Sequence, residues 1–166
     1  MKKLITLAAA IFLSVSGVAA AAPYADKIEV TSITSPISKM IIKAAKVPDR
    51  SSVGIPCYPG AKIFQTRDKG EVEINGQRHK TLAYIKLLST DPVDKIVAWY
   101  KEQLKEYTYE DAFGMSVFWK GKGKFNGLDM RQRMTIQNVG ISPAIDAMGY
   151  DKDMKGARSV IETTYE

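Results

Sequence analysis

The sequence predicts an α+β fold, in which a single twisted antiparallel sheet is packed by one main helix, with an additional helix near the N-terminus. Two observations carry this prediction. Short strand-like segments follow one another in runs, and one strongly amphipathic segment at residues 92–105 lies in their middle. The connections between strands are short, which favours antiparallel pairing over parallel crossovers. The 166 residues show no internal repeat or low-complexity tract, and their number suits one domain.

The first 21 residues have the pattern of a secretory signal peptide. Lys2 and Lys3 precede an uncharged, mostly apolar run over residues 4–20, which ends in small side chains. Small residues at the third and first positions before a cut predict cleavage near Ala20 and Ala21, or one residue later. An uncleaved anchor helix is the alternative, but the run is slightly short for the roughly 20 residues that span a membrane. We therefore expect a periplasmic or secreted protein.

The single cysteine limits the covalent chemistry that we expect. A lipoprotein would need a cysteine at the cut, and Cys57 lies well beyond it. Cys57 is either a buried small residue, an exposed free thiol or half of an intermolecular bridge. Removal of two lysines with the signal lowers the net charge from +6 to about +4, on a mature chain of about 145 residues.

Residues 22–55 are expected to form an N-terminal helix and a connector, packed as one unit with an α+β domain at residues 56–166. The helix is predicted over residues 36–46, with Ser35 as its cap and Pro36 in its first turn. Pro48 ends this helix, and the polar residues 49–54 are typical of a connector.

A meander of strands follows a turn at residues 58–60. We expect strands over residues 61–65, 71–74 and 80–89. Asn75 and Gly76 predict a tight hairpin turn between the second and third strands, because both tolerate a positive φ.

The main helix is predicted over residues 92–105. Asp91 is expected to cap it, Pro92 suits its first turn, and Asp94 places a negative charge near the positive end of the helix dipole. The residues at helical spacing that should face the sheet are Val93, Ile96, Val97, Tyr100 and Leu104.

The C-terminal half adds further strands. We expect two strands, over residues 107–109 and 115–119, around a turn near Gly114, then a loop over residues 120–124. A strand over residues 130–139 and a short helix from Ser142 and Pro143 to Met148 come next. The last strand is predicted over residues 157–165, which are rich in β-branched side chains.

Two segments together resemble a loose group of small exported bacterial α+β domains of unknown function. The first is Pro-Cys-Tyr-Pro-Gly-Ala-Lys at residues 56–62, and the second is Asp-Pro-Val-Asp-Lys-Ile-Val-Ala-Trp-Tyr-Lys-Glu-Gln-Leu at residues 91–104. The resemblance covers roughly residues 56–119 and implies a turn that opens the first strand and a helix that follows the meander. The matching residues form turns and core, so the resemblance implies no catalytic role.

The strongest candidate binding surface is the loop after residue 118. Three lysines, Lys120, Lys122 and Lys124, lie between the aromatic residues Trp119 and Phe125. Lysines attract anions over a long range, and aromatic side chains insert at membrane interfaces. This pattern predicts contact with anionic lipid or lipopolysaccharide. The alternative is an ordinary hairpin tip whose aromatic side chains pack into the core.

Other candidate groups are weaker. Glu110 and Asp111 are adjacent carboxylates, His79 is the only histidine, and a dyad of Cys57 with His79 is conceivable. Two aspartates at residues 151 and 153 lack the longer ligand series of an EF-hand. One histidine and one cysteine exclude a site rich in those ligands, and the glycine spacing matches no phosphate-binding motif, so we expect no metal and no cofactor.

These observations favour a non-enzymatic binding or interaction module in the periplasm, which contacts anionic envelope components or an envelope protein, and not nucleic acid. Two alternatives stay open. One is a small periplasmic hydrolase that uses carboxylates such as Glu110 and Asp111. The other is a protein inhibitor of an exported enzyme, since small basic exported domains suit that role.

Overall fold

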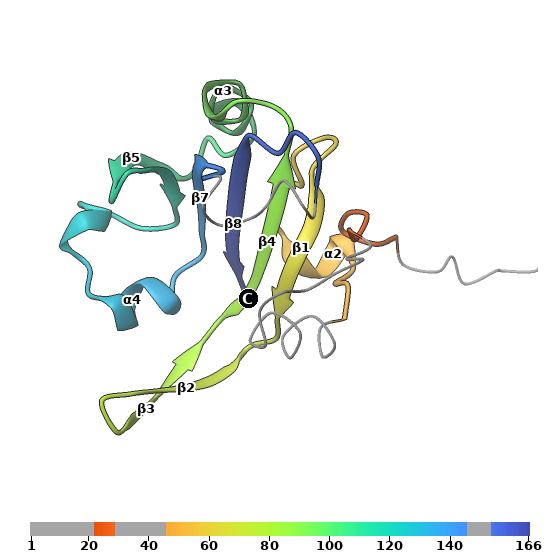
Figure 1. Cartoon of the computed structure of the whole chain (residues 1–166). Coiled ribbons are helices and arrows are strands. Elements are labelled where there is room, and N and C mark those ends of the chain that lie inside the picture. The colour runs from red at the N-terminus through yellow and green to blue at the C-terminus, as the bar shows by residue number, and fades with distance from the viewer. Residues whose placement is uncertain (1–21, 29–45, 146–153) are drawn as a thin grey trace, which may run out of the picture.

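The computed structural model describes residues 22–28, 46–145 and 154–166 (Figure 1). Its helices and strands are, in chain order, α2 (Arg50–Val53), β1 (Lys62–Arg67), β2 (Gly70–Ile74), β3 (Gln77–Thr81), β4 (Ala83–Ser89), α3 (Val93–Gln103), β5 (Thr108–Ala112), β6 (Met115–Trp119), the 3-10 helix η1 (Phe125–Gly127), α4 (Met130–Met134), β7 (Asn138–Pro143) and β8 (Ser159–Tyr165).

Six of the strands form one antiparallel sheet in the order β1-β4-β8-β7-β6-β5. The last strand of the chain, β8, lies in the middle, where Ile161 pairs with Leu87 of β4 and with Ile141 of β7. Strands β2 and β3 form a separate two-stranded hairpin. The predicted α+β class with one main antiparallel sheet is confirmed.

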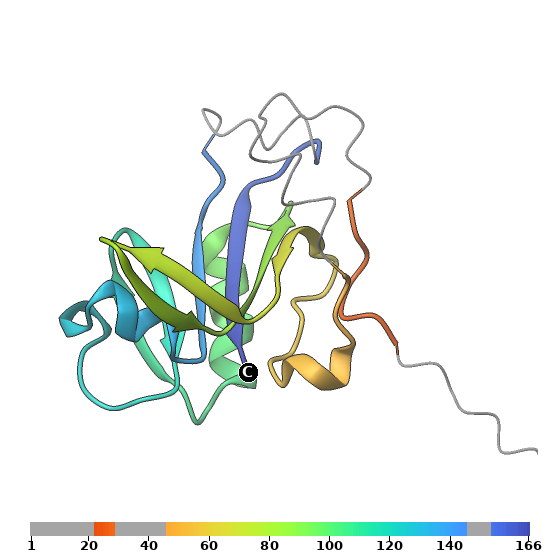
Figure 2. The same ribbon diagram turned by 90° about the horizontal axis from the view of Figure 1, so that it is seen from below.

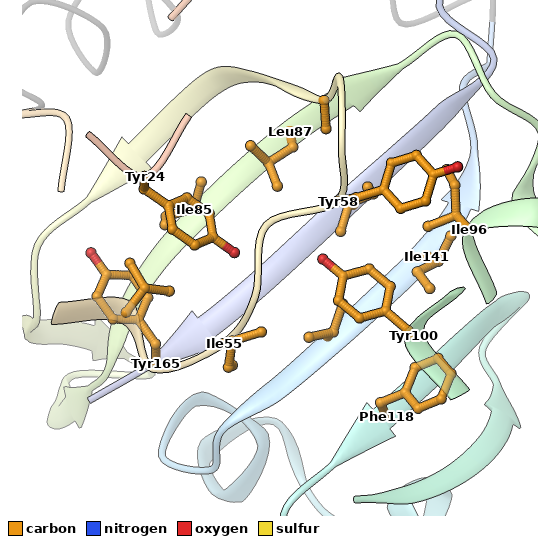
Figure 3. Close-up of a cluster of buried hydrophobic side chains, with 14 of the residues drawn as sticks. Tyr24, Ile55, Tyr58, Ile85, Leu87, Ile96, Tyr100, Phe118, Ile141 and Tyr165 are labelled. Atoms are coloured by element: carbon orange, nitrogen blue, oxygen red, sulfur yellow. The ribbon is translucent and has the colours of Figure 1, made fainter. Parts of the chain in front are cut away.

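The main core lies between the sheet and α3 (Figure 3). Alternate residues of the central strands point to this side, and Ile85, Ile141 and Ile161 are fully buried there. From α3, Ile96 and Tyr100 are also fully buried, as the predicted stripe requires. The Tyr100 hydroxyl donates a hydrogen bond to the carbonyl oxygen of Pro56 at 3.2 Å, so its polar atom is satisfied inside the core.

The N-terminal segment completes this core and covers one edge of the sheet. Tyr24 is fully buried among the same side chains, and its backbone N–H donates to the carbonyl of Pro48 at 2.8 Å. Ile28 donates to the carbonyl of Ile63 at 3.0 Å, and Ile63 donates to that of Asp26 at 2.7 Å. These bonds pair the outer side of β1, an edge strand that would otherwise present open backbone groups.

The opposite face of the sheet carries a different set of elements. The hairpin β2-β3 and helix α4 lie on the side of the sheet away from α3 (Figure 2). A small second core forms there under η1, where Val117, Trp119 and Phe125 are buried. The hairpin is tied to α4, since the N–H of Leu82 donates to the carbonyl of Met134 at 2.9 Å.

Two hairpins share one turn geometry but differ in sequence. Between β2 and β3, Asn75 and Gly76 have φ angles of 53° and 74°. Between β5 and β6, Phe113 and Gly114 have φ angles of 55° and 74°. Asparagine and glycine adopt such angles readily, whereas a bulky aromatic residue rarely does. The first turn confirms the prediction, and the second places a strained phenylalanine at the surface.

Several predictions about the first half need correction. The helix predicted over residues 36–46 lies almost wholly outside the described residues, and the connector predicted over residues 49–54 contains the short helix α2. The strand predicted over residues 80–89 is two strands, which meet at Leu82. Asp91 does not cap α3, because the cap position is Pro92 and its side chain makes no cap hydrogen bond. Instead, the Asp91 carboxylate accepts hydrogen bonds from Tyr58 at 2.7 Å and Lys95 at 2.9 Å.

The strand predicted over residues 130–139 is wrong for its first half, which forms α4. Asp129 and Gln132 make reciprocal side-chain to backbone bonds at 2.8 and 2.9 Å, and this capping box starts the helix. Ser142 and Pro143 belong to β7 rather than to the start of a helix. Within the part of the chain that the structure describes, no helix is long and apolar enough to cross a membrane.

Candidate functional site

The face of the sheet away from α3 has an open groove with a volume of about 390 Å³. Strands β4, β8, β7 and β6 contribute to its floor, while α4, η1 and the turn between β5 and β6 form its wall. The residues that line it are Arg67, Tyr84, Phe113, Met115, Val117, Phe125, Met130, Arg133, Met134, Asn138, Gly140, Glu162 and Thr164.

The floor changes from polar to apolar across the strands. One row of paired residues, on β4, β8 and β7, consists of Tyr84, Thr164 and Asn138. The adjacent row runs from Glu162 on β8 to Val117 on β6. Because strand order and pairing fix these positions, one end of the groove is polar and the other is apolar.

Gly140 lies in the middle of this floor, between Glu162 and Val117 in the register. It has no side chain to fill the hollow. A Cβ atom built on Gly140 would lie 3.6 Å from Sδ of Met115, which is an ordinary van der Waals distance. The backbone would therefore accept a larger residue here, and the glycine keeps space open rather than relieving a backbone conflict.

The apolar end of the groove is exposed to solvent. Phe113 is 54% exposed and Met130 is 65% exposed, although both are large apolar side chains. Met115 and Met134 extend the same surface. Unbranched methionine side chains adapt their shape to what they contact, and exposed apolar patches mark interaction sites more often than chance.

Arg133 fixes the wall of the groove. Its guanidinium lies 3.9 Å from the ring centroid of Phe113 and 5.8 Å from that of Phe125. The same group donates hydrogen bonds to the carbonyl of Leu128, one of them from Nε at 2.9 Å. Phe113 is thus held in its strained turn conformation by a cation above its ring. Strain of this kind gathers at sites where function requires a particular geometry.

The polar end contains a hydrogen-bonded group of side chains. The Tyr84 hydroxyl donates to Oε1 of Glu162 at 2.7 Å, and Nζ of Lys86 lies 3.0 Å from the same oxygen. Arg67 lies over the Tyr84 ring, 5.5 Å from its centroid. The Glu162 charge is therefore neutralised by a lysine, whereas Arg67 has no carboxylate partner among the described residues.

The five residues of the predicted aromatic and basic surface fall into two groups, exposed lysines and buried aromatic residues. Lys120, Lys122 and Lys124 are exposed, as expected for a loop. Trp119 and Phe125 are 2% and 4% exposed, with ring centroids 5.8 Å apart in the second core. The two aromatic side chains are therefore packed, and only the three lysines are accessible to a partner. Phe125 also borders the groove.

The carboxylates Glu110 and Asp111 do not converge. Glu110 accepts hydrogen bonds from the backbone N–H groups of Phe125 and Asn126, so it fixes the start of η1. Asp111 accepts hydrogen bonds from the hydroxyls of Tyr109 at 2.8 Å and Ser116 at 2.9 Å. These two bonds hold the pKa of Asp111 below its usual value. Neighbouring strand residues point to opposite faces, which is why the pair separates.

Cys57 and His79 lie on different elements. Cys57 borders a second cavity of about 410 Å³, near Tyr24 and Arg50, and burial raises the pKa of its thiol to about 11. His79 lies on β3 of the hairpin, where its Nε2 has no hydrogen-bond partner among the described residues. The thiol stays protonated at neutral pH, so it is a poor nucleophile.

Metal ligands do not gather in the described ranges either. No group of three histidine, cysteine or carboxylate residues that would hold a metal ion occurs within residues 22–28, 46–145 and 154–166. The aspartates at residues 151 and 153 lie outside these ranges.

The sequence analysis does not predict the groove, although the sequence contains two signals for it. Phe113 occupies a turn position where asparagine is usual, and Gly140 interrupts a strand with no turn beside it. Each is a local departure from the residue that the backbone would favour, and such departures concentrate at functional sites.

The chain was compared with known proteins for evidence of relatives. No protein-family model, no curated protein and no solved structure matches it. The resemblance to small exported bacterial domains therefore stays a prediction.

Proposed function

We propose that this chain is an exported, non-enzymatic binding module that holds an apolar ligand in the groove opposite α3. The observation that carries the proposal is the convergence of two exposed apolar side chains, Phe113 and Met130, on a hollow in the sheet. A volume of about 390 Å³ is in the range of small-molecule sites. The strained φ of Phe113 and the missing side chain of Gly140 both preserve this hollow.

Ligand binding is tested with a neutral fluorescent apolar probe, N-phenyl-1-naphthylamine, whose emission rises in an apolar site. The mature protein should bind it, and Gly140→Leu should weaken binding at least tenfold because the leucine fills the floor of the groove. Gly70→Leu is the matched control, since Gly70 also lies in a strand, but on the hairpin, and nothing lies within 4 Å of a Cβ atom built on it. Equal binding by both variants would contradict a site in the groove.

Export is supported by the basic, apolar and small segments at the N-terminus. The described chain is anchored immediately after the expected cut, because the carbonyl of Ala22 accepts a hydrogen bond from the N–H of Arg50 at 3.0 Å. The intact mass of protein from a periplasmic fraction should correspond to a chain that starts at Ala21 or Ala22. A mass that includes Met1 would contradict cleavage.

A second candidate function is electrostatic contact with anionic envelope lipid through the loop lysines. It is favoured by the exposure of Lys120, Lys122 and Lys124. Since Trp119 and Phe125 are packed, this contact would depend on charge and weaken as salt rises. Sedimentation with anionic vesicles should fall when the three lysines are changed to glutamine, and retention of binding by that variant would exclude the loop.

The hydrolase alternative gains no support from the carboxylates that suggested it. Glu110 is committed to the backbone of η1, and Asp111 points away from it with two hydroxyl donors of its own. The two carboxylates therefore do not converge on one substrate, as the acid and the base of a hydrolase would.

A further inference from the structure

We infer that the ligand of the groove is a single-chain amphiphile with an anionic head group, such as a medium- or long-chain carboxylate. This inference rests on the proposed function of the groove and adds the chemical class of its ligand. Three features of the groove support this ligand class. Its lining is positively charged, one of its ends is polar and the other apolar, and the apolar end is rich in methionine.

The lining carries an excess of positive charge. Arg67 and Arg133 both border the groove, and neither forms an ion pair with a described carboxylate. The one acidic lining residue, Glu162, is already bound by Lys86 at 3.0 Å. An anionic ligand would therefore meet two guanidinium groups that have no described carboxylate partner, and no lining carboxylate that lacks a cation.

The surroundings reinforce this charge. Residues 120–137, which form η1, α4 and the loops around them, contain five lysine and arginine residues and one aspartate, a net charge of +4. The whole chain carries +6, so much of its excess lies beside the groove. A concentrated positive field raises the local concentration of anions and the rate at which they bind.

The two arginines are suited to different roles. Arg133 is fixed by the Leu128 carbonyl and by the ring of Phe113, so it shapes the wall. Arg67 lies at the polar end over Tyr84, is exposed, and makes no hydrogen bond with another described side chain. Its planar guanidinium is free to bind a carboxylate through two parallel hydrogen bonds. We place the head group at Arg67.

The hydrocarbon tail of the ligand would then extend from Arg67 across Gly140 toward the methionines. From Arg67 the floor leads through the polar row, past the open space at Gly140, to Met115 and Met130. Three methionines and two phenylalanines line the groove, and flexible thioether side chains suit a flexible chain better than a fixed planar ligand. Each further methylene that is buried should strengthen binding about threefold to fourfold until the groove is full.

The test compares three ligands with the same ten-carbon chain, namely decanoate, decanol and decylamine, as competitors of N-phenyl-1-naphthylamine on the mature protein. Decanoate should displace the probe at about a tenfold lower concentration than decanol, and decylamine should be the weakest. Arg67→Gln should weaken decanoate about tenfold and leave decanol unchanged. Arg131→Gln is the matched control, because Arg131 lies on α4 but does not line the groove.

The outcomes separate this inference from the proposed function. If all three ligands compete equally, or if Arg67→Gln and Arg131→Gln lose the same affinity for decanoate, the groove still binds apolar ligands but the anionic ligand class is wrong. If neither the probe nor any of the three ligands binds, the proposed function fails and the inference fails with it. Unchanged affinity of Arg67→Gln for decanol shows that the variant is folded, so a selective loss of decanoate supports the head group position.

Discussion

On the face of the sheet toward α3, the central strands place Ile85, Ile141 and Ile161 under a helix, with none of their surface exposed. On the other face, the same strands place Glu162 and Gly140 under an open groove. Ile141 and Gly140 are neighbours in β7, yet one fills space and the other leaves it empty. The alternation of side chains along a strand thus lets one strand fill a core on one face and line an open groove on the other.

The largest effect is expected when a buried side chain on the α3 face of the sheet is truncated. Ile141→Ala should lower the free energy of unfolding by about 2–5 kcal/mol, because a cavity would remain in a fully buried site. Urea unfolding measures this change. Ile145→Ala is the control, since Ile145 is 62% exposed and its truncation should change the stability by less than about 0.5 kcal/mol. Similar losses in the two variants would mean that the α3 face is not close-packed.

A substitution in the loop before η1 tests whether the small core on the groove side is also close-packed. A Cβ on Gly121 would overlap the ring of Trp119, which is only 2% exposed, so Gly121→Ala should lower the free energy of unfolding by about 1–3 kcal/mol. Gly127→Ala is the matched control, because nothing lies within 4 Å of the added atom. If urea unfolding midpoints shift equally in the two variants, the Trp119 indole can move aside at no cost in stability.

The two hairpin turns allow a reciprocal exchange. Phe113→Asn should raise the free energy of unfolding by about 1 kcal/mol, because asparagine tolerates the φ of 55°. Asn75→Phe should lower it by a similar amount at a φ of 53°. If Phe113 is retained for binding, its replacement should also weaken the apolar probe, and Asn75→Phe should not. A loss of stability in Phe113→Asn would mean that the stack on Arg133 outweighs the strain.

The smallest effect on stability is expected at Asp91, and it depends on pH. The Asp91 carboxylate connects the loop before β1 to the start of α3. Hydrogen bonds from Lys95 and Tyr58 lower the pKa of the Asp91 carboxyl below its ordinary value of 3.8. Its contribution to stability is therefore present above that value and is lost as the pH falls through the lowered pKa. Asp91→Asn should be less stable than the parent chain near neutral pH, with the difference shrinking below pH 3.8 in thermal unfolding curves. A difference that stays constant would exclude this linkage.

Much of the fold could be predicted because the residues that decide it act locally. The stripe of α3, the Asn75-Gly76 turn and the β-branched last strand each depend on neighbours in sequence. The strand predicted over residues 130–139 is wrong for residues 130–134, because their alternating polarity fits a strand whereas the capping box of Asp129 and Gln132 favours a helix. The spacing of an N-cap aspartate and a glutamine three residues later is visible in the sequence.

The candidate site was harder to predict because it depends on which strands become neighbours. Trp119 and Phe125 look like a surface pair beside lysines. The face of the sheet on which Trp119 lies is set by the pairing of β6 with β5 and β7, and Phe125 of η1 packs against it there. Gly140 lies beside Glu162 and Val117 only through β8 and β6, at sequence distances that no local pattern reports. Local sequence patterns do not show what these residues surround, because the order of the strands in the sheet determines it.

The central place of β8 also has a consequence for the order of events during synthesis. Strands β1 and β4 form one half of the sheet and β5 to β7 the other, and only the last seven-residue strand joins them. Until Ser159–Tyr165 have been synthesised, no strand lies between Ile85 of β4 and Ile141 of β7. Contacts between distant parts of a chain form slowly. The six-stranded sheet therefore cannot be completed until residues 159–165 are available for pairing.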